Sequence, residues 1–372
     1  MNNIQQKKIK RPNKFIGVDI FSGSGGLSLG AEMAGIDVQY AVESWSNAAK
    51  TFKRNHPNAI VFNEEIEAID PNTKIAKDGK HIFIIMGGPP CQGFSMSNQR
   101  REEHGRTMEN PKNQLFKHFV RFVDELQPDW FLFENVAGII NMEKGETIKM
   151  IAQSFKDLGY NISDPTILWA NDYGVPQKRN RCFIVGNKMG INFEFPKSYG
   201  TSVTVSDAID DLPILKTGDN INEASYRLSI NECSAYAKTM RRNSKNSLQN
   251  YVSLNSELVI KRYSHIPQGG NWKDIPEELM TNYRDKGRCH SGIYKRLNAH
   301  SPSVVISNYR KMMLIHPTQD RGLSVREAAR LQSFPDDFVF EGPISHIQQQ
   351  IGNAVPPLLA KAIIKQILSY YE

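Results

Sequence analysis

The sequence predicts an α/β fold in which helices cover both faces of a largely parallel sheet. Short apolar runs typical of buried strands alternate with amphipathic stretches as far as residue 186, and a glycine-rich turn follows the first run. Parallel strands need helical crossovers, so this alternation favours a parallel sheet. A chain of 372 residues also has room for a second, smaller domain after it.

The first predicted unit is a strand, a glycine turn and a helix. Residues 14–20 read as a buried strand, the turn Phe-Ser-Gly-Ser-Gly-Gly occupies 21–26, and apolar residues at helical spacing follow over 27–34. The next predicted strand, 38–42, ends at Glu43. This order is typical of a nucleotide-binding βαβ unit, in which such a carboxylate accepts hydrogen bonds from ribose hydroxyls.

The alternation continues along the first half of the chain, and a last helix is expected at the C-terminus, where apolar residues recur at helical spacing. The further predicted helices are 44–55, 114–126, 146–158 and the segment from 358 to 367. The further predicted strands are 59–62, 82–86, 129–134, 166–170 and 181–186.

A turn after the predicted strand 82–86 carries a cysteine in the sequence Gly-Gly-Pro-Pro-Cys-Gln-Gly-Phe-Ser, 87–95. The glycines allow other groups to approach the backbone, and the prolines stiffen the turn. Ligands bind at the carboxyl ends of strands in open α/β sheets, so Cys91 is a candidate nucleophile. This stretch alone leaves open the alternative that Cys91 is a small core residue.

Composition and charge narrow the function classes. The net charge of +7 favours an anionic partner, nucleic acid first. None of the four cysteines has the spacing of a metal site, and the nine histidines are scattered, so neither a metal site nor a disulfide framework is expected. There is no apolar run long enough for a membrane span and no signal peptide pattern, so we expect a soluble intracellular protein.

The segment from 191 to about 295 is polar and irregular, and is predicted to form most of a second domain. Cations with interleaved tyrosines suggest a basic face for nucleic acid, although an ordinary solvated surface explains the charges equally well. The cations are Lys238, Arg241, Arg242, Lys245, Lys261 and Arg262.

Three further motifs complete a pattern: Phe-Glu-Asn-Val at 133–136, Asp-Tyr-Gly-Val-Pro-Gln-Lys-Arg-Asn-Arg at 172–181, and Gln-Ile-Gly-Asn-Ala-Val-Pro-Pro at 350–357. With the glycine turn and the Pro-Pro-Cys-Gln turn, they follow the order found in DNA (cytosine-5) methyltransferases. The chain resembles this family throughout, apart from a variable insert before Arg296. The resemblance implies a Rossmann-like S-adenosylmethionine-dependent domain, 1–189 plus 345–372, and a small DNA target-recognition domain, 190–344.

The resemblance implies methylation of carbon 5 of cytosine in a short double-stranded DNA sequence, as in bacterial restriction-modification systems. Cys91 would add to carbon 6 of a flipped-out cytosine, and Glu134 would hydrogen-bond the ring. Arg181 would contact the base, and Arg179 would order the site. The two arginines are two positions apart, and on a strand such residues point to the same face. The alternatives are an ion-pair partner for Glu134 and surface positions for the arginines.

The implied methyl donor is S-adenosylmethionine. Phe21 would stack on the adenine, Gly23 would allow close backbone approach, and Glu43 would hold the ribose. Glu65 stands where the family usually has Asp. Asn353 would support the cofactor, cap a helix, or do both. The full predicted cofactor set is Asp19, Phe21, Gly23, Gly25, Gly26, Glu43, Ser44, Glu65, Ile66, Pro89, Asn353 and Ala354.

The polar loop 94–113 is predicted to close over bound DNA, because a long loop beside a nucleophile is usually functional. A plain surface loop is the alternative. The predicted DNA-contacting residues are Ser95, Arg100, Arg101, Arg106, Arg241 and Arg242. Double-stranded DNA is the expected partner of a cytoplasmic monomer, with no membrane association and no obligate protein partner.

Three rival functions remain. A tRNA cytosine methyltransferase would use the same chemistry, but that branch of the family lacks a long insert such as 191–295. A non-catalytic DNA-binding relative has no need of Cys91, Glu134 and Arg181. A nicotinamide-dependent oxidoreductase fits the glycine turn alone. The sequence does not reveal which DNA sequence is recognised, because base contacts depend on side chains of the insert.

Overall fold

The computed structural model describes residues 14–76, 79–90, 114–242, 244–281 and 292–371. By its internal contacts the chain divides into two compact units. Unit 1 comprises Met1–Trp169, Asn180–Ser198 and Pro357–Glu372, and unit 2 comprises Ala170–Arg179 and Tyr199–Pro356. Residues 170–179 and 345–356, which the sequence analysis grouped with the catalytic domain, therefore pack with unit 2. The assignment of the units to catalysis and DNA recognition stays a prediction.

Unit 1 contains an eight-stranded sheet with the order β3-β2-β1-β4-β5-β8-β6, in which β7 also pairs with β8. Its first five strands pair in parallel, as expected. The remaining strands pair antiparallel: β8 with β5, β6 and β7, an arrangement not expected from the sequence. β7 and β8 are joined by the short segment 170–179, which is not a helical crossover of the kind parallel strands require.

The strands of this sheet agree closely with the predicted runs. Each begins and ends within a few residues of its prediction, and only β6 was not expected. The strands are β1 Ile16–Ile20, β2 Asp37–Val42, β3 Ile60–Phe62, β4 Ile84–Gly87, β5 Trp130–Val136, β6 Asn161–Ile162, β7 Thr166–Trp169 and β8 Asn180–Asn187.

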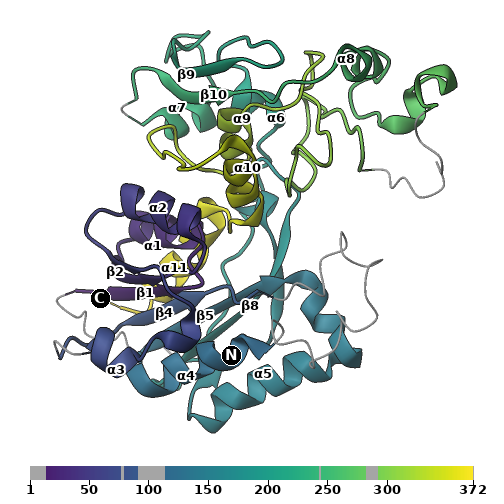
Figure 1. Ribbon diagram of the computed structural model, residues 1–372. Coiled ribbons are helices and arrows are strands. Elements are labelled where there is room, and N and C mark those ends of the chain that lie inside the picture. Colours follow the sequence, from purple (N-terminus) through teal and green to yellow (C-terminus); the bar gives the residue numbers. More distant parts are fainter. Residues whose placement is uncertain (1–13, 77–78, 91–113, 243, 282–291, 372) are drawn as a thin grey trace. The chain divides into compact units, whose positions relative to one another are not determined.

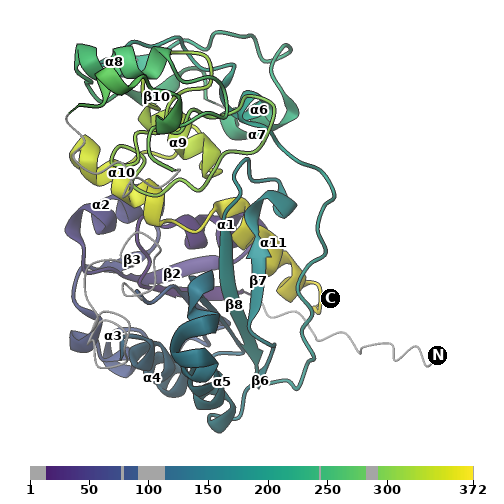
Figure 2. The same cartoon turned by 90° about the vertical axis from the view of Figure 1, so that its right-hand side faces the viewer.

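Helices cover both faces of the sheet: α1, α2 and α11 lie on one side, and α3, α4 and α5 on the other (Figures 1 and 2). Successive side chains of β1 point to opposite faces of the sheet, so the strand contacts both layers. Val18 and Ile20 pack in the apolar core with Phe119 of α4. Asp19, between them, accepts a hydrogen bond from Ser28 of α1. The helices are α1 Gly26–Ala34, α2 Ser46–Asn55, α3 Pro71–Lys74, α4 Phe116–Leu126, α5 Glu146–Asp157 and α11 Pro357–Leu368, with 3-10 turns at Ile66–Ala68 and Ala137–Gly145.

Helix α1 packs unusually closely against α11, because Gly30 lies at their contact. A Cβ at Gly30 would lie 2.4 Å from the Pro357 carbonyl oxygen and 2.5 Å from Ala360 Cβ. The last helix, which was predicted from its apolar spacing, is thereby held directly against the helix that follows the glycine turn.

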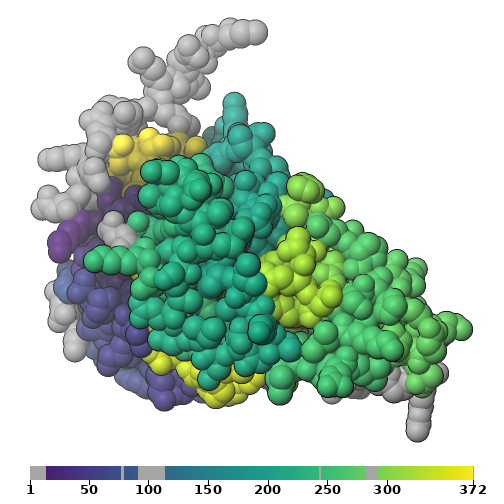
Figure 3. All heavy atoms as spheres, turned by 90° about the horizontal axis from the view of Figure 1, so that it is seen from above, coloured from purple at the N-terminus to yellow at the C-terminus, as the bar shows by residue number. Residues whose placement is uncertain are grey.

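Unit 2 has its own small sheet, formed by antiparallel pairing of β9 and β10, and several short helices. Teal and green segments of this unit form much of the surface seen in Figure 3. Its elements are β9 Asn220–Ala224, β10 Ser247–Tyr251, α6 Val205–Ile209, α7 Ala235–Arg241, α8 Glu257–Ser264, α9 Val325–Leu331 and α10 Ile344–Asn353, with 3-10 turns at Ala170–Tyr173, Trp272–Asp274 and Glu277–Leu279.

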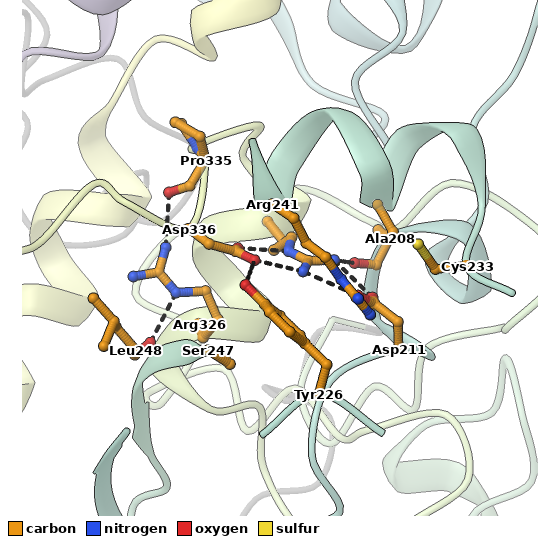
Figure 4. Close-up of polar contacts among 12 residues, drawn as sticks. Ala208, Asp211, Tyr226, Cys233, Arg241, Ser247, Leu248, Arg326, Pro335 and Asp336 are labelled. Carbon is orange, nitrogen blue, oxygen red and sulfur yellow. Dashed lines mark hydrogen bonds and ion pairs between the residues drawn. The ribbon is translucent and has the colours of Figure 1, made fainter. Parts of the chain in front are cut away.

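A buried network of ion pairs lies at the centre of unit 2 (Figure 4). Arg330 of α9 bridges Asp211, at 2.7 Å, and Asp336, at 2.6 Å, and all three side chains are at most 2% exposed. Tyr226 donates its hydroxyl to Asp336 at 2.6 Å. Burial alone would raise the pKa of Asp336, but Arg330 and its hydrogen bonds lower it overall. The pairing thus keeps the carboxylate charged inside the protein.

Within the described part of the chain, every helix is too short or too polar to span a membrane.

We predict that Gly30→Ala destabilises unit 1 by about 1–3 kcal/mol, because the added methyl group overpacks the contact between α1 and α11. The usual helix-stabilising effect of alanine is smaller, at about 1 kcal/mol. Thermal unfolding measures the difference. Gly322→Ala is the control, since a Cβ there meets nothing closer than 3.7 Å. Equal melting temperatures for Gly30→Ala and the wild type would contradict the close packing.

Candidate active site

The carboxyl ends of β1, β4 and β5 meet at one edge of the sheet. Gly87, the last residue of β4, pairs with Ile20 on one side and with Phe133 on the other. A Cβ at Gly87 would lie 2.1 Å from the Ile20 carbonyl oxygen, so glycine is required at this close approach. Residues that follow these strand ends are consequently gathered into a small region of unit 1.

Glu134 and Arg181 form an ion pair at this edge. Glu134 lies opposite Phe183, and Val136 lies opposite Arg181, so the two charged residues are diagonal neighbours on one face of the sheet. Arg181 Nε donates to Glu134 Oε1 at 2.9 Å, with the two side chains 15% and 10% exposed. Burial lowers the pKa of Arg181, and the Glu134 carboxylate counteracts this effect.

The turn after β4 is bound to the same strand end. A Cβ at Gly88 would lie 2.4 Å from Glu134 Oε2, and Asn135 Nδ2 donates to the Pro89 carbonyl oxygen at 3.0 Å. The Gly-Gly-Pro-Pro turn is therefore fixed beside the Glu134 carboxylate. Cys91 follows this turn directly in the sequence but lies outside the described residues.

Arg179 does not share a strand with Arg181, because β8 begins only at Asn180 and Arg179 belongs to unit 2. Its buried guanidinium group donates to the carbonyl oxygens of Ile306 and Gly352, each at 2.9 Å. The cation thereby satisfies carbonyl groups at the C-terminal end of α10. In this structure Arg179 thus links separate segments of unit 2, and its predicted role in ordering the active site stays a prediction.

The glycine turn forms the second part of the site in unit 1. Glu43 accepts hydrogen bonds from the backbone N–H groups of Gly23, at 2.8 Å, and Trp45, at 2.7 Å. Burial raises the pKa of Glu43. Phe21 and Gly23 both have positive φ angles, 60° and 55°, so the turn is sharply bent.

The turn encloses buried polar atoms. Asp19 Oδ2 accepts from Ser28 Oγ at 2.5 Å, and burial raises the pKa of Asp19 to about 7. Asp19 Oδ1 and the hydroxyl groups of Ser22 and Ser24 are buried and lack hydrogen-bond partners within the described ranges. A ligand with polar groups would complete this bonding, so the residues fit a cofactor at this position.

The remaining predicted cofactor residues differ in accessibility. Gly25 precedes α1 with a φ angle of 93°, and a Cβ there would lie 2.5 Å from His56 Nε2, while Gly26 is the first residue of the helix. Ser44 and Glu65 are exposed, whereas Ile66 and Pro89 are buried. Ile66 packs in the apolar core, so its backbone is better placed for a ligand than its side chain.

Asn353 and Ala354 lie at the end of α10 in unit 2. Asn353 is exposed, and its Oδ1 accepts from Gln349 Nε2, one turn earlier on the helix, at 2.6 Å. Ala354 is the C-cap residue of this helix. Their predicted contact with the cofactor stays a prediction.

The structure describes only some of the residues that were predicted to contact DNA. Ser95, Arg100, Arg101 and Arg106 lie outside the described residues. Arg242 is exposed, with its guanidinium group 3.4 Å from Asp337.

The expectation that Arg241 contacts DNA is corrected by its burial. Arg241 is 4% exposed, its Nε donates to Asp211 Oδ2 at 2.7 Å, and its guanidinium group lies 3.8 Å from the ring centre of Tyr226. Arg262, a second member of the expected basic face, is also buried, at 2% exposure. Both cations belong to the interior of unit 2, so the basic surface is smaller than the sequence suggested.

Cys182 is not an alternative nucleophile. It lies on β8 with its side chain in the apolar core, and burial raises the pKa of its thiol to about 12. A thiol with such a pKa has almost no thiolate at neutral pH. Cys233, the other cysteine in the described part of the chain, is also buried.

Two contributors to the site were not singled out from the sequence. Asn135 bonds the turn beside Glu134, and Ser28 bonds Asp19. Asn135 stands next to Glu134 within its motif, which is a usable signal. The close approach at Gly88 agrees with the expectation for the glycines of this turn. Ser28 gave no signal beyond its place on the predicted helix after the turn. Among the described residues no cluster of potential metal ligands occurs.

Comparisons with known proteins agree on one family. The model of the C-5 cytosine-specific DNA methylases matches residues 15–369. Type II methyltransferase M1.HphI of Haemophilus parahaemolyticus is 37% identical over 94% of this chain and 86% of its own length. Type II methyltransferase M.DdeI of Desulfomicrobium norvegicum is 35% identical over 95% of this chain and 89% of its own length. A crystal structure described as an E. coli prophage DNA modification methyltransferase has a TM-score of 0.77 and 30% identity, covering 96% of this chain and 99% of its own.

We predict that methionine lowers the stability of unit 2 strongly at Arg241 and hardly at all at the adjacent Arg242. Arg241→Met leaves Asp211 with one cation fewer in the interior, and should destabilise unit 2 by roughly 3 kcal/mol. Arg242→Met removes an exposed charge and should change stability by no more than about 0.5 kcal/mol. Thermal unfolding of both variants measures the contrast, and equal melting temperatures would contradict the burial of Arg241.

Proposed function

The chain belongs to the C-5 cytosine-specific DNA methylases and is a DNA cytosine-5 methyltransferase, and we propose that it modifies one short, specific double-stranded sequence as the methylase of a restriction-modification system. The observation that carries the proposal is the Glu134–Arg181 pair, held beside the turn that leads to Cys91. The proposal places the enzyme in the bacterial cytoplasm, where its DNA substrate is found.

The target cytosine must leave the helix, because its carbon 6 cannot be reached by a protein side chain within stacked base pairs. Unstacking and unpairing cost roughly a few kcal/mol. Contacts to the DNA backbone would offset this cost, and we propose Arg100, Arg101, Arg106 and Ser95 of the loop 94–113 for that role, with Arg242 contributing from unit 2.

The reaction needs a nucleophile and a hydrogen-bond donor for the ring. In the proposed mechanism the Cys91 thiolate adds to carbon 6, which makes carbon 5 electron-rich enough to attack a methyl group. The carbon 5 proton then passes to the solvent as the bond between sulfur and carbon 6 breaks, which restores the ring and the thiolate. Glu134 hydrogen-bonds the ring nitrogen and exocyclic amine where negative charge develops. Arg181, bonded to Glu134 through Nε, orients this carboxyl group, while its Nη1 donates to the Asn180 carbonyl oxygen at 2.8 Å. Its Nη2 group is the donor that we propose for the base.

S-adenosylmethionine is the proposed methyl donor, and when bound it supplies an electrophilic methyl group on a positively charged sulfur. Glu43 would accept from the ribose hydroxyls, since its two oxygens are already oriented by the N–H groups of Gly23 and Trp45. Phe21, in its strained backbone conformation, would stack on the adenine.

Two alternatives keep the family but change the substrate or the activity. A tRNA substrate is disfavoured by the insert 191–295, which forms most of the separately folded β9–β10 and α7–α8 region of unit 2. A non-catalytic DNA-binding relative would have no use for a buried Glu134–Arg181 pair at a strand end.

Methyl transfer from tritiated S-adenosylmethionine tests the proposed function directly. We expect label in unmethylated plasmid DNA and none in tRNA, followed by bisulfite sequencing that finds the modified cytosines within one recurring sequence. Cys91→Ala should abolish transfer. Labelling of tRNA alone, or modified cytosines without a common sequence, would reject the proposal.

We predict that Glu134→Gln lowers kcat by about 10²–10⁴, because the amide cannot supply a proton to the ring as charge develops. The affinity for S-adenosylhomocysteine should change less than about twofold, since Glu134 is assigned to the base and not to the donor. Single-turnover methylation and calorimetry measure the two quantities. Glu146→Gln, at an exposed position in the same unit, is the matched control. A large loss of donor affinity with unchanged kcat would remove Glu134 from the catalytic set.

A further inference from the structure

Arg121 of α4 holds two backbone carbonyl groups of the segment that follows β3. Its Nη1 donates to the Ile69 carbonyl oxygen and its Nη2 to the Ile66 carbonyl oxygen, each at 2.9 Å. Ile66 begins the 3-10 turn in this segment, and Ile69 directly follows it. A planar guanidinium group can bind two acceptors side by side, so this one side chain holds the turn at two points.

The same helix supports this arrangement through a second side chain. Glu125, one turn after Arg121, has its Oε1 3.6 Å from Arg121 Nη1, and its Oε2 accepts from Asn72 Nδ2 at 3.2 Å. Asn72 belongs to α3, which lies beside α4 (Figures 1 and 2). The partners in these three hydrogen bonds are 52 to 55 residues apart in the sequence, so α4 anchors a segment from a distant part of the chain.

Much of the anchored turn is exposed to solvent. Ile66 and Ile69 are buried in the apolar core, whereas residues 67–68 between them and 63–65 before them are exposed. Exposed segments with few apolar contacts are the parts of a protein that lose their order most readily. We therefore expect the two bonds from Arg121 to have a large effect on the order of this turn.

The start of the segment is bonded to the residues that follow β2. Asn63 Nδ2 donates to the carbonyl oxygens of Glu43, at 2.8 Å, and Ser44, at 3.0 Å. Glu65 stands between these bonds and those of Arg121. Burial raises the pKa of Glu43 most, and the Glu65 carboxylate raises it further, so the two carboxylates are near each other. The turn thus lies beside the residue proposed for the ribose.

We propose that Arg121 is a positioning residue for the methyl donor, because it keeps the backbone at Glu65 and Ile66, two of the predicted donor-binding residues, in place beside Glu43. The inference rests on the proposed function and gives Arg121 no contact with the donor. The bonds of Arg121 end on main-chain oxygens, so its support is independent of the side chain at position 65, where the family usually has Asp.

Loss of this support should weaken donor binding without slowing the chemical step. Without the guanidinium group, only a fraction of the molecules has the turn in its ordered position. The apparent affinity then falls in proportion to that fraction. A bound donor favours the ordered turn, so the complex reacts as the wild-type complex does once donor is saturating.

Substitutions of Arg121 combined with calorimetry provide the test. Arg121→Met removes both bonds and keeps an apolar stem, and its Kd for S-adenosylhomocysteine, the demethylated donor, should rise about tenfold. Its kcat at saturating donor and DNA should stay within about twofold of the wild type. Arg121→Lys keeps a cation that bonds one carbonyl oxygen at a time, so its Kd should rise only about threefold.

Lys117→Met is the matched control. Lys117 lies one turn before Arg121 on the same helix, is exposed, and donates to Gln114 Oε1 at 3.0 Å. This substitution makes the same change of charge as Arg121→Met without touching the turn after β3. Its Kd for S-adenosylhomocysteine should equal that of the wild type.

Each outcome decides for or against the inference. An unchanged Kd in Arg121→Met, an equal rise in Lys117→Met, or a Kd of Arg121→Lys as high as that of Arg121→Met would overturn it while the proposed function stands. A lowered melting temperature with an unchanged Kd would assign Arg121 to stability alone. If Arg121→Met does not fold, a Kd of Arg121→Lys equal to that of the wild type overturns the inference.

The proposed function can fail separately. A wild type that binds S-adenosylhomocysteine but transfers no methyl group to DNA would reject the proposed function, while the Kd values of the variants still test Arg121. A wild type that does not bind S-adenosylhomocysteine would overturn both the inference and the proposed cofactor.

Discussion

The antiparallel register between β5 and β8 is the constraint on which the candidate active site depends. It places Glu134 and Arg181 on one face as diagonal neighbours and brings the guanidinium group to 2.9 Å from the carboxylate. Successive strand residues point to opposite faces, so a shift of one residue would exchange Arg181 with Cys182. Arg181 would then enter the apolar core that Cys182 now occupies, and Glu134 would lose its partner. The same edge requires glycine at 87, where a side chain would collide with the Ile20 carbonyl oxygen, and a side chain at 88 would displace the Glu134 carboxylate.

Most of unit 1 could be predicted from the sequence, because its strands and helices carry clear apolar periodicity. The position of Glu134 at a strand end followed from its motif. The burial of Arg241 could not be predicted, since its partner Asp211 is 30 residues away and nothing in the sequence pairs them. The partners of Arg179 could not be predicted for the same reason: its guanidinium group is bound to the carbonyl oxygens of Ile306 and Gly352, which are 127 and 173 residues away. Side-chain partners that are distant in sequence leave no periodic signal.

The interior of unit 2 contains several buried arginines that are bonded to carboxylates and carbonyl oxygens, which its polar sequence did not suggest. Arg330 bridges Asp211 and Asp336, Arg321 pairs with Glu327 at 2.7 Å, and Arg326 donates to the carbonyl oxygens of Pro335 and Phe338. Removing one member of such a set is costly, because its partner is left buried and unpaired. These three arginines, of which Arg326 and Arg330 lie on α9, form a buried frame within unit 2.

The division of unit 2 into two pieces of chain has a consequence for anyone who builds chimaeras within this family. The piece 170–179 contributes Gln177, which bonds Gln332 and the Ile306 N–H group. It also contributes Arg179, which donates to the carbonyl oxygens of Ile306 and Gly352. A transplant that begins at residue 199 would leave these two side chains behind, facing a foreign surface. A transplant of unit 2 therefore has to include residues 170–179 as well as 199–356.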